Sequence, residues 1–185
     1  MLVLIYGDIG TGKTFTSVLL TEMLYQENNN LKIFTNCKYK NQTGDLLEIF
    51  NPDVQNDIDS QKLLIFDEID KFADSRNSSS KTNIMFSYLL SLSRKINLDI
   101  IATTQLYKSM DLRYRDLSNI SILPELNNDT GLLRLEIYKH SNSTLYNKKF
   151  QVDLEKVYSL YETKYLTLHT IKYYKSELKK YVKDF

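Results

Sequence analysis

A glycine-rich run near the start of the chain is compatible with only a few folds. Residues 7–14 read Gly-Asp-Ile-Gly-Thr-Gly-Lys-Thr and match the pattern G-x-x-x-x-G-K-[ST]. The apolar run Met1–Tyr6 before it is typical of a buried strand, and Thr14–Gln26 after it has helical periodicity. A strand, a glycine-rich turn and a helix in this order predict a loop whose backbone N–H groups surround a chain of phosphates.

Each part of this loop has an expected role in binding a nucleotide. The glycines let the backbone close around the phosphates, and the helix that follows adds the positive end of its dipole. We expect Lys13 to reach the β- and γ-phosphates and the Thr14 hydroxyl to bind Mg²⁺. The residues expected to hold the nucleotide are Gly7, Asp8, Ile9, Gly10, Thr11, Gly12, Lys13 and Thr14. The alternative, a turn that only connects a strand to a helix, is disfavoured because the motif and both flanks agree.

Two acidic residues follow a second apolar strand. The stretch Lys62–Phe66 is strongly apolar and leads directly into Asp67 and Glu68, the Walker B pattern. An acid at the carboxyl end of a central strand lies beside the phosphate loop. We therefore expect Asp67 to hold Mg²⁺ through a water and Glu68 to orient or deprotonate an attacking water. A chance pair of acids is the alternative. The Asp-Glu pair favours hydrolysis over transfer of the phosphoryl group to another acceptor.

A third strand ends in a polar amide. The stretch Leu98–Thr103 continues into Thr104 and Gln105. In this position the Gln105 amide would lie next to the γ-phosphate, where it positions the water or detects loss of the phosphate. Many strands end in polar residues, so this pattern has weight only together with the two motifs above.

Strands and helices alternate in an order that predicts one α/β domain with a mostly parallel central sheet over residues 1–185. Other expected strands are Leu31–Thr35, Ile120–Leu123 and Leu132–Tyr138, and the last of these is expected to be part of an edge hairpin. We also expect a loop or irregular helix at residues 51–61, a surface loop at 74–82 and a basic helix at 170–185. The segment Asn83–Lys95 is expected to be a helix whose apolar face carries Ile84, Tyr88, Leu89 and Leu92.

Composition limits the other classes of function. The net charge of +1 provides no overall basic field for nucleic acid. Residues 139–185 hold ten Lys against five acidic residues, which fits either a polyanion partner or a solvated helix face. Cys37 is the only cysteine, which excludes an intrachain disulfide, and we interpret it as a buried filler near a strand end. His140 and His169 are isolated and form no metal cluster. No run approaches the ~20 apolar residues that span a bilayer.

Together the three motifs resemble the FtsK–HerA superfamily of P-loop motors. Its members combine an Asp-Glu acid pair, a Gln at the end of the following strand and an arginine just before that strand, which here is Arg94. The resemblance covers most of residues 1–165. It is greatest to the small packaging ATPases of archaeal and other membrane-containing viruses, followed by the Zot-like assembly ATPases of bacteriophages. Other segments that look like this group are Phe34–Asn36, Ser93–Gln105, Asp111–Arg115 and Tyr158–Thr163.

The resemblance implies a RecA-like P-loop NTPase that hydrolyses ATP with Mg²⁺ at sites completed between the subunits of a ring, a hexamer or pentamer. It implies that Arg94 is an arginine finger for a neighbouring subunit, with Arg113 and Arg115 as rivals. A surface arginine at a helix C-terminus is the alternative. We also hypothesise that Asn36 holds Glu68 away from water until the substrate is engaged.

The function implied by the resemblance is translocation of double-stranded viral DNA into a preformed capsid. A capsid or portal protein would be the partner, in the cytoplasm of a host cell. Arg76 and Lys81, or the basic C-terminal helix, are candidate DNA contacts. One alternative is a Zot-like ATPase that extrudes single-stranded DNA through a membrane complex, which the lack of a membrane span disfavours. The other is a switch or scaffold that binds ATP without moving DNA, which the hydrolytic residues disfavour.

Overall fold

The computed structural model describes residues 1–72, 81–105, 107, 112–162, 173 and 176. The strands are β1 (Leu2–Tyr6), β2 (Lys32–Thr35), β3 (Lys38–Tyr39), β4 (Gly44–Asp45), β5 (Lys62–Phe66), β6 (Leu98–Thr104), β7 (Ile120–Asn127), β8 (Leu132–Lys139), β9 (Thr144–Gln151) and β10 (Tyr161–Glu162). The helices are α1 (Lys13–Glu27), α2 (Pro52–Asn56), α3 (Lys81–Leu92), α4 (Leu112–Leu117) and α5 (Leu154–Tyr158), with 3₁₀ turns η1 (Leu46–Phe50), η2 (Ile69–Lys71) and η5 (His140–Asn142).

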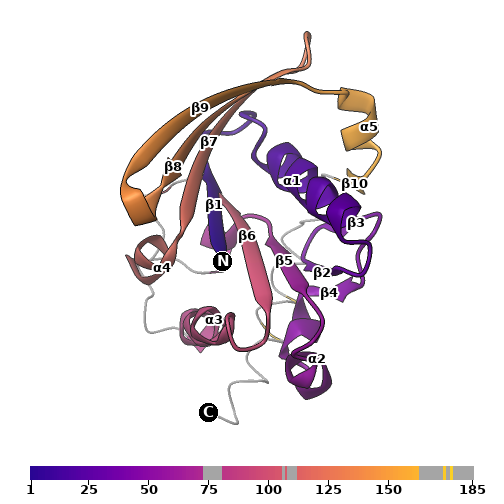
Figure 1. The fold of residues 1–185 in the computed structure, drawn as a ribbon, viewed down its shortest axis with the longest axis vertical. Helices are drawn as coiled ribbons and strands as arrows, with labels where there is room; N and C mark the ends of the chain where they lie inside the picture. Colours follow the sequence, from indigo (N-terminus) through magenta and orange to yellow (C-terminus); the bar gives the residue numbers. More distant parts are fainter. Residues whose placement is uncertain (73–80, 106, 108–111, 163–172, 174–175, 177–185) are drawn as a thin grey trace.

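The central sheet has eight strands in the order β4-β2-β5-β6-β1-β7-β8-β9. Neighbours from β4 to β7 are parallel, and β7, β8 and β9 form an antiparallel meander that curves over the top and one side of the molecule in Figure 1. This is the RecA-like P-loop NTPase fold that the sequence predicts. The strand β6 lies between β1 and β5. The phosphate loop after β1, the acid pair after β5 and Gln105 after β6 therefore lie side by side at the carboxyl ends of the strands.

Each face of the sheet has its own apolar core, because a parallel sheet is covered on both faces. On one face Phe15 of α1 and Val157 of α5 pack against the strands. On the other face the core includes Phe86 of α3 and Tyr114 of α4. Helices thus lie on both faces of the sheet (Figure 1). The strand ends that carry the phosphate loop are therefore held by an apolar core on each face.

The apolar face predicted for α3 is partly wrong. Leu89 is buried as expected, but its companions on the buried side are Met85 and Phe86, whereas Ile84 and Tyr88 are 49% and 41% exposed. Apolar residues occur around most of this helix, so periodicity alone does not decide which stripe faces the sheet.

The strand predicted at Leu132–Tyr138 is part of an edge hairpin as expected, but the sequence did not predict the outer strand of that hairpin, β9. The strand at residues 132–139 is an inner strand, because β9 pairs with it and forms the sheet edge. The sequence of β9 contains little apolar alternation, since it is exposed along almost its whole length, and periodicity therefore did not identify it. Residues 51–61 include the short helix α2, in agreement with an irregular helix.

Several expectations lie outside the described residues. These are Arg76 and most of the segment 74–82, His169, all of the predicted helix at 170–185 except residues 173 and 176, and the side chains of Lys81 and Arg113. Cys37 is buried, and burial raises the pKa of its thiol to about 12, which agrees with an unreactive filler. His140 Nε2 lies 2.8 Å from Ser121 Oγ, so this histidine has a structural partner. No helix in the described ranges has the length and apolar character needed to cross a membrane.

Candidate nucleotide-binding site

The loop between β1 and α1 has the backbone shape that phosphate binding requires. Gly10 and Gly12 have φ angles of 84° and 91°, in the left-handed region that favours glycine. A Cβ on Gly12 would lie 2.7 Å from the Cβ of Leu126, so no larger residue fits there. The helix α1 begins without a side-chain cap and without an acidic residue in its first turn. Its first N–H groups and the positive end of its dipole therefore remain available for an anion.

Lys13 and Thr14 point to the same side of this loop as the Walker B aspartate. Lys13 Nζ donates to the carbonyl oxygen of Asp8 at 2.7 Å. Burial lowers the pKa of Lys13, and the negative charges of Asp67 and Glu68 oppose that change. Thr14 Oγ1 lies 3.0 and 3.3 Å from the two carboxylate oxygens of Asp67. A hydroxyl and a carboxylate this close can both face one Mg²⁺, which prefers oxygen ligands and keeps several waters.

Asp67 is fixed through both its side chain and its main chain. Thr103 Oγ1 donates to Asp67 Oδ1 at 2.6 Å. Asn36 Nδ2 donates to the Asp67 carbonyl oxygen and the Asp67 N–H donates to Asn36 Oδ1, each at 2.8 Å. Burial raises the pKa of Asp67, while the hydrogen bonds from Thr103 and Thr14 counteract that rise. A bound cation at this place would further stabilise the ionised carboxylate.

The hypothesis that Asn36 holds Glu68 is wrong for this structure. The amide of Asn36 pairs with the main chain of Asp67, because a primary amide offers the donor and acceptor that complement the Asp67 N–H and carbonyl groups. Asn36 thereby aligns the end of β2 with the end of β5. Its role is to position the Walker B segment, not to restrain the Glu68 carboxylate.

Replacing Asn36 by Ala is expected to lower the free energy of unfolding by about 3 kcal/mol, because it leaves a buried N–H and a buried carbonyl without partners. Urea unfolding measures the change. Asn30→Ala, at an exposed position, is the matched control and should leave the midpoint unchanged. Equal midpoints for Asn36→Ala and the unmodified chain would contradict this role.

Glu68 occupies a strained turn directly after Asp67. Its φ angle is 53°, a left-handed conformation that costs a non-glycine residue about 1 kcal/mol or more. The Glu68 N–H donates to Thr103 Oγ1 at 2.8 Å, which holds the turn. Gln105 Nε2 donates to Glu68 Oε1 at 2.9 Å, and Lys71 forms an ion pair with Oε2. The structure thus brings Glu68 and Gln105 together, and Lys71 occupies the second carboxylate oxygen.

Glu68 and Gln105 line a cavity of about 260 Å³ together with Gly12, Lys13 and Thr14 of the phosphate loop and the start of α1. The lining also includes Phe15, Leu126, Asn128, Tyr158 and Tyr161, of which Leu126 lies against Gly12 of the phosphate loop. The Tyr158 ring packs edge-on against the Phe15 ring with centroids 5.3 Å apart, and its hydroxyl donates to Asn128 Oδ1 at 2.8 Å. Aromatic rings with a few fixed polar groups are typical of a ligand pocket and suit a nucleobase.

Sequence reasoning named the segment Tyr158–Thr163 as one that looks like the motor group but gave it no place in this cavity, and it missed Asn128, Lys71 and Thr103. Asn128 comes from the turn after β7 and Tyr158 from α5, far along the chain from the phosphate loop. No local motif joins these segments. The only signal available for Lys71 was its spacing of three residues from Glu68, which becomes meaningful once Glu68 is known to begin the turn η2.

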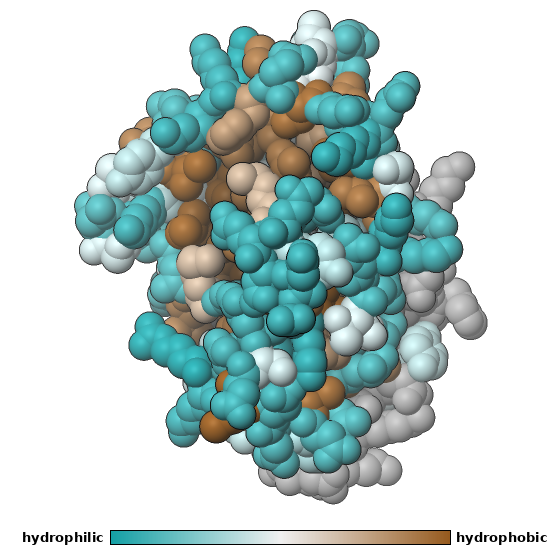
Figure 2. Space-filling model, turned by 45° about the vertical axis from the view of Figure 1, so that its right-hand side comes forward, coloured by the Kyte–Doolittle hydropathy of each residue, from teal (hydrophilic) through white to brown (hydrophobic). Residues whose placement is uncertain are grey.

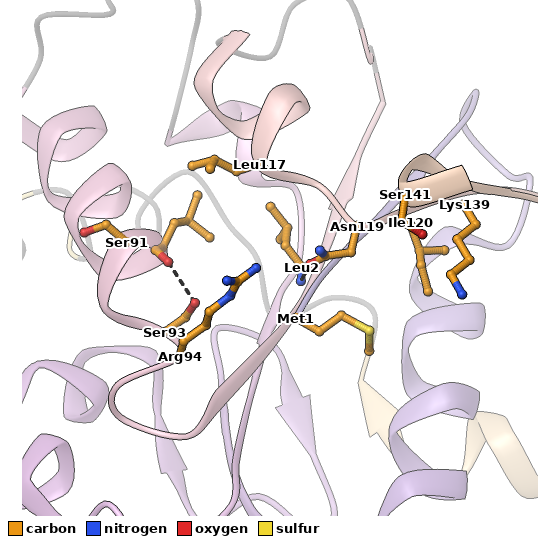
Figure 3. A pocket seen from close by; sticks show the side chains of 11 residues that line it. Met1, Leu2, Ser91, Ser93, Arg94, Leu117, Asn119, Ile120, Lys139 and Ser141 are labelled. Atoms are coloured by element: carbon orange, nitrogen blue, oxygen red, sulfur yellow. Dashed lines mark hydrogen bonds between the residues drawn. The ribbon is translucent and has the colours of Figure 1, made fainter. Parts of the chain in front are cut away.

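Arg94 lies at the opposite end of the sheet, near the amino-terminal ends of the parallel strands. It lines a cavity of about 640 Å³ with Leu2, Asn119 and Lys139 among others, and Figure 3 shows its guanidinium directed into that cavity. Leu2 begins β1 and the phosphate loop follows the end of β1, so the length of the strand, about 17 Å, separates the two cavities. Arg94 therefore does not reach the nucleotide site of its own chain.

The rival arginines are placed differently. The guanidinium carbon of Arg115 lies 5.8 Å from the centroid of the Tyr107 ring, a cation–π contact. Arg113 lies in α4, and its side chain is outside the described part. Among the described side chains, Arg94 is thus the candidate finger that faces away from its own nucleotide site.

The family comparison agrees with this geometry. The model of the ATPase family associated with various cellular activities (AAA) matches residues 3–125. The chain belongs to this AAA family. The matched region runs from β1 into β7 and contains the phosphate loop, the acid pair and Gln105 of this AAA ATPase. No curated protein matches it significantly.

Solved structures resemble this AAA ATPase over most of its length. The N-terminal domain of zonular occludens toxin from Neisseria meningitidis has 25% identity and a TM-score of 0.62, over 87% of this chain and 98% of that one. The genome packaging NTPase of Sulfolobus turreted icosahedral virus 2, in complex with ATP-γ-S, has 10% identity and a TM-score of 0.63, over 82% and 97%. EccC of Thermomonospora curvata has 14% identity and a TM-score of 0.58, over 82% and 37%. The first two represent the groups that the sequence resembles, which confirms the resemblance in the fold.

Proposed function

We propose that this AAA ATPase hydrolyses ATP with Mg²⁺ and uses the reaction to move viral DNA, with packaging of double-stranded DNA into a preformed capsid as the first candidate. The observation that supports hydrolysis is the cluster at the carboxyl edge of the sheet. There the phosphate loop, Thr14 and the Glu68–Gln105 pair line one cavity, and Asp67 lies behind Thr14 at hydrogen-bond distance. In this proposal residues 1–185 act as one ATPase domain.

In the proposed reaction a water attacks the γ-phosphorus of ATP, the bond from that phosphorus to the β–γ bridging oxygen breaks, and ADP leaves. Glu68 accepts the proton that the water loses, and Gln105 orients the water. Lys13 and the N–H groups of α1 stabilise the negative charge on the phosphate oxygens. Thr14 and Asp67 would hold a Mg²⁺ ion, which would neutralise negative charge on the phosphate oxygens.

Two contacts have to change before this reaction begins. Lys13 must exchange the Asp8 carbonyl for phosphate oxygens, and the nucleotide favours this exchange because a charged acceptor binds an ammonium more strongly than a carbonyl does. Glu68 must leave Gln105 or Lys71 so that one carboxylate oxygen faces the water. ATP binding alone is therefore expected to bring Lys13 to the phosphates, whereas Glu68 becomes available as a base only after a further rearrangement of its contacts.

We infer that Arg94 acts on the nucleotide of a neighbouring copy. It lies at the amino edge of the sheet and the nucleotide cavity lies at the carboxyl edge, so one copy completes the site of the next only in head-to-tail packing. Repeated head-to-tail contacts form a ring when the rotation between copies closes, and we propose such a ring as a hexamer or pentamer. A capsid or portal protein would be the docking partner of this ring, in the cytoplasm of the host cell.

A second candidate is a Zot-like ATPase that extrudes single-stranded phage DNA. The specific observation in its favour is the 25% identity to the zonular occludens toxin domain, compared with 10% to the packaging NTPase. Both candidates use the same hydrolytic cluster, and they differ in the form of DNA that is moved.

The test is ATP turnover without DNA, with duplex DNA and with single-stranded DNA, over a range of protein concentrations. We expect turnover to rise steeply with concentration and with duplex DNA, and the stimulation to weaken with salt because phosphate contacts release counterions. Stimulation by single strands alone would favour the second candidate. Turnover independent of both DNA and concentration would contradict a motor and favour an ATP-dependent switch.

A further inference from the structure

The edge strand β9 has an unusual surface for the free edge of a sheet. It pairs with β8 along one side, and seven of its eight residues are exposed. Its sequence, Thr-Leu-Tyr-Asn-Lys-Lys-Phe-Gln, contains two lysines and no acidic residue. Neither lysine takes part in an ion pair with the other residues that the structure describes.

The two faces of β9 differ in chemistry. The register pairs Phe150 with Leu133, Lys148 with Leu135 and Tyr146 with Ile137, so these three side chains lie on one face of the sheet. Their partners Leu133 and Leu135 belong to the core beneath α1. The opposite face carries Leu145, Asn147, Lys149 and Gln151, beside the acidic Glu136 and the ion-paired Arg134.

On the first face an aromatic, a lysine and an aromatic follow one another at every second residue. Tyr146 and Phe150 are 41% and 42% exposed although they continue the face that forms the core on β7 and β8. Figure 2 shows apolar side chains gathered in a hollow on the side of the molecule turned toward the viewer. The exposure of Tyr146 and Phe150 shows that the residues described in the structure leave this face partly uncovered at β9.

The charges select the occupant of this face. An edge strand of a second copy would bring Lys148 and Lys149 close to their own counterparts, and like charges at a sheet edge oppose such pairing. A polyanion is favoured by the same charges. Two aromatic rings on either side of a lysine suit nucleic acid in particular. Its bases can stack on the rings without sequence preference, and its phosphates can contact the lysine.

We propose that this face of β9 binds single-stranded nucleic acid, with Tyr146 and Phe150 stacking on bases and Lys148 contacting a phosphate between them. The Cα atoms of the two aromatics are about 13 Å apart along an extended strand, so each ring takes a separate base. Duplex DNA keeps its base faces stacked inside the helix and offers them to neither ring. The site is separate from the nucleotide cavity, and it rests on the proposed function only in the choice of DNA as the probe.

The experiment uses the absence of tryptophan from the sequence. Phe150→Trp places a single indole on the proposed stacking face, and Leu145→Trp places one on the opposite face of the same strand, where Leu145 is 57% exposed. Both variants are titrated with an oligothymidylate of about 15 nucleotides, without ATP. We expect quenching of the Phe150→Trp fluorescence and none for Leu145→Trp. Adding Tyr146→Ala should weaken binding about tenfold, and adding Lys148→Ala should reduce its salt dependence.

Three outcomes would overturn the proposal. They are no quenching of Phe150→Trp, equal quenching of both tryptophans, and a fluorescence change with protein concentration alone, which would indicate pairing between copies. Repeating the titration with Lys13→Ala separates this site from the motor. Quenching that persists in that variant supports the β9 site even if DNA fails to stimulate ATP turnover, and quenching lost with Lys13→Ala would overturn a site independent of the nucleotide cavity.

Discussion

Arg94→Ala is expected to reduce ATP turnover by about 10³-fold or more while leaving ATP affinity unchanged. An arginine finger contributes roughly 10³–10⁵ to the rate in other P-loop enzymes, through the charge that develops in the transition state. Arg94 lines the cavity at the amino edge of the sheet and lies away from the phosphate loop of its own chain, so its loss leaves the binding residues intact. Steady-state turnover and binding of a fluorescent ATP analogue measure the two quantities separately.

Mixing two inactive variants decides whether the arginine acts between copies. Lys13→Ala removes the phosphate-loop ammonium but retains Arg94, and Arg94→Ala retains the phosphate loop. A mixed ring contains interfaces in which an intact loop faces an intact arginine, so turnover should return. Lys95→Ala, at the neighbouring exposed residue, is the control and should behave as the unmodified chain. A mixture that stays inactive, or full activity of Arg94→Ala alone, would contradict a finger in trans.

The parts of the site that the sequence predicted are those carried by contiguous residues. The phosphate loop is a motif of eight neighbouring residues, and its glycines have the left-handed angles that such a turn requires. The proximity of Thr14 to Asp67 was predictable from the same motifs, because the phosphate loop that leads to Thr14 follows β1, Asp67 follows β5, and the carboxyl ends of parallel strands meet at one end of the sheet. The order of the strands then brings Gln105 to Glu68.

The parts that the sequence did not reveal depend on pairing between distant segments. The aromatic part of the cavity lining needs the turn after β7 and the helix α5 to lie beside α1. The resemblance pointed to the segment Tyr158–Thr163, but no local pattern placed Asn128 or Tyr158 in the cavity. The role given to Asn36 was wrong because its proximity to the Walker B strand was predictable but its hydrogen-bond partner was not. An amide near Asp67 and Glu68 has several acceptors within reach, and only the side-chain geometry selects the main chain of Asp67.

Glu68→Gln is expected to lower ATP turnover by about 10²–10⁴-fold, the contribution of a general base, while ATP binding is retained. The amide has nearly the same shape as the carboxylate, so the turn held by Thr103 should persist, but it cannot accept the proton from the water. Single-turnover hydrolysis measures the chemical step directly. Glu125→Gln is the matched control, since Glu125 is an exposed residue outside the nucleotide cavity.

A Glu68→Gln variant that hydrolyses ATP at the original rate would contradict the assignment of the base.

The contacts of Glu68 make a second comparison informative. Gln105 and Lys71 occupy both carboxylate oxygens in this structure, so the base is restrained before it acts. Lys71→Ala removes one restraint and leaves the base in place. If Glu68 is the base, Glu68→Gln should lower ATP turnover by the same factor in the unmodified chain and in Lys71→Ala. Removing Lys71 frees the amide introduced at position 68, but an amide does not accept the proton of the water.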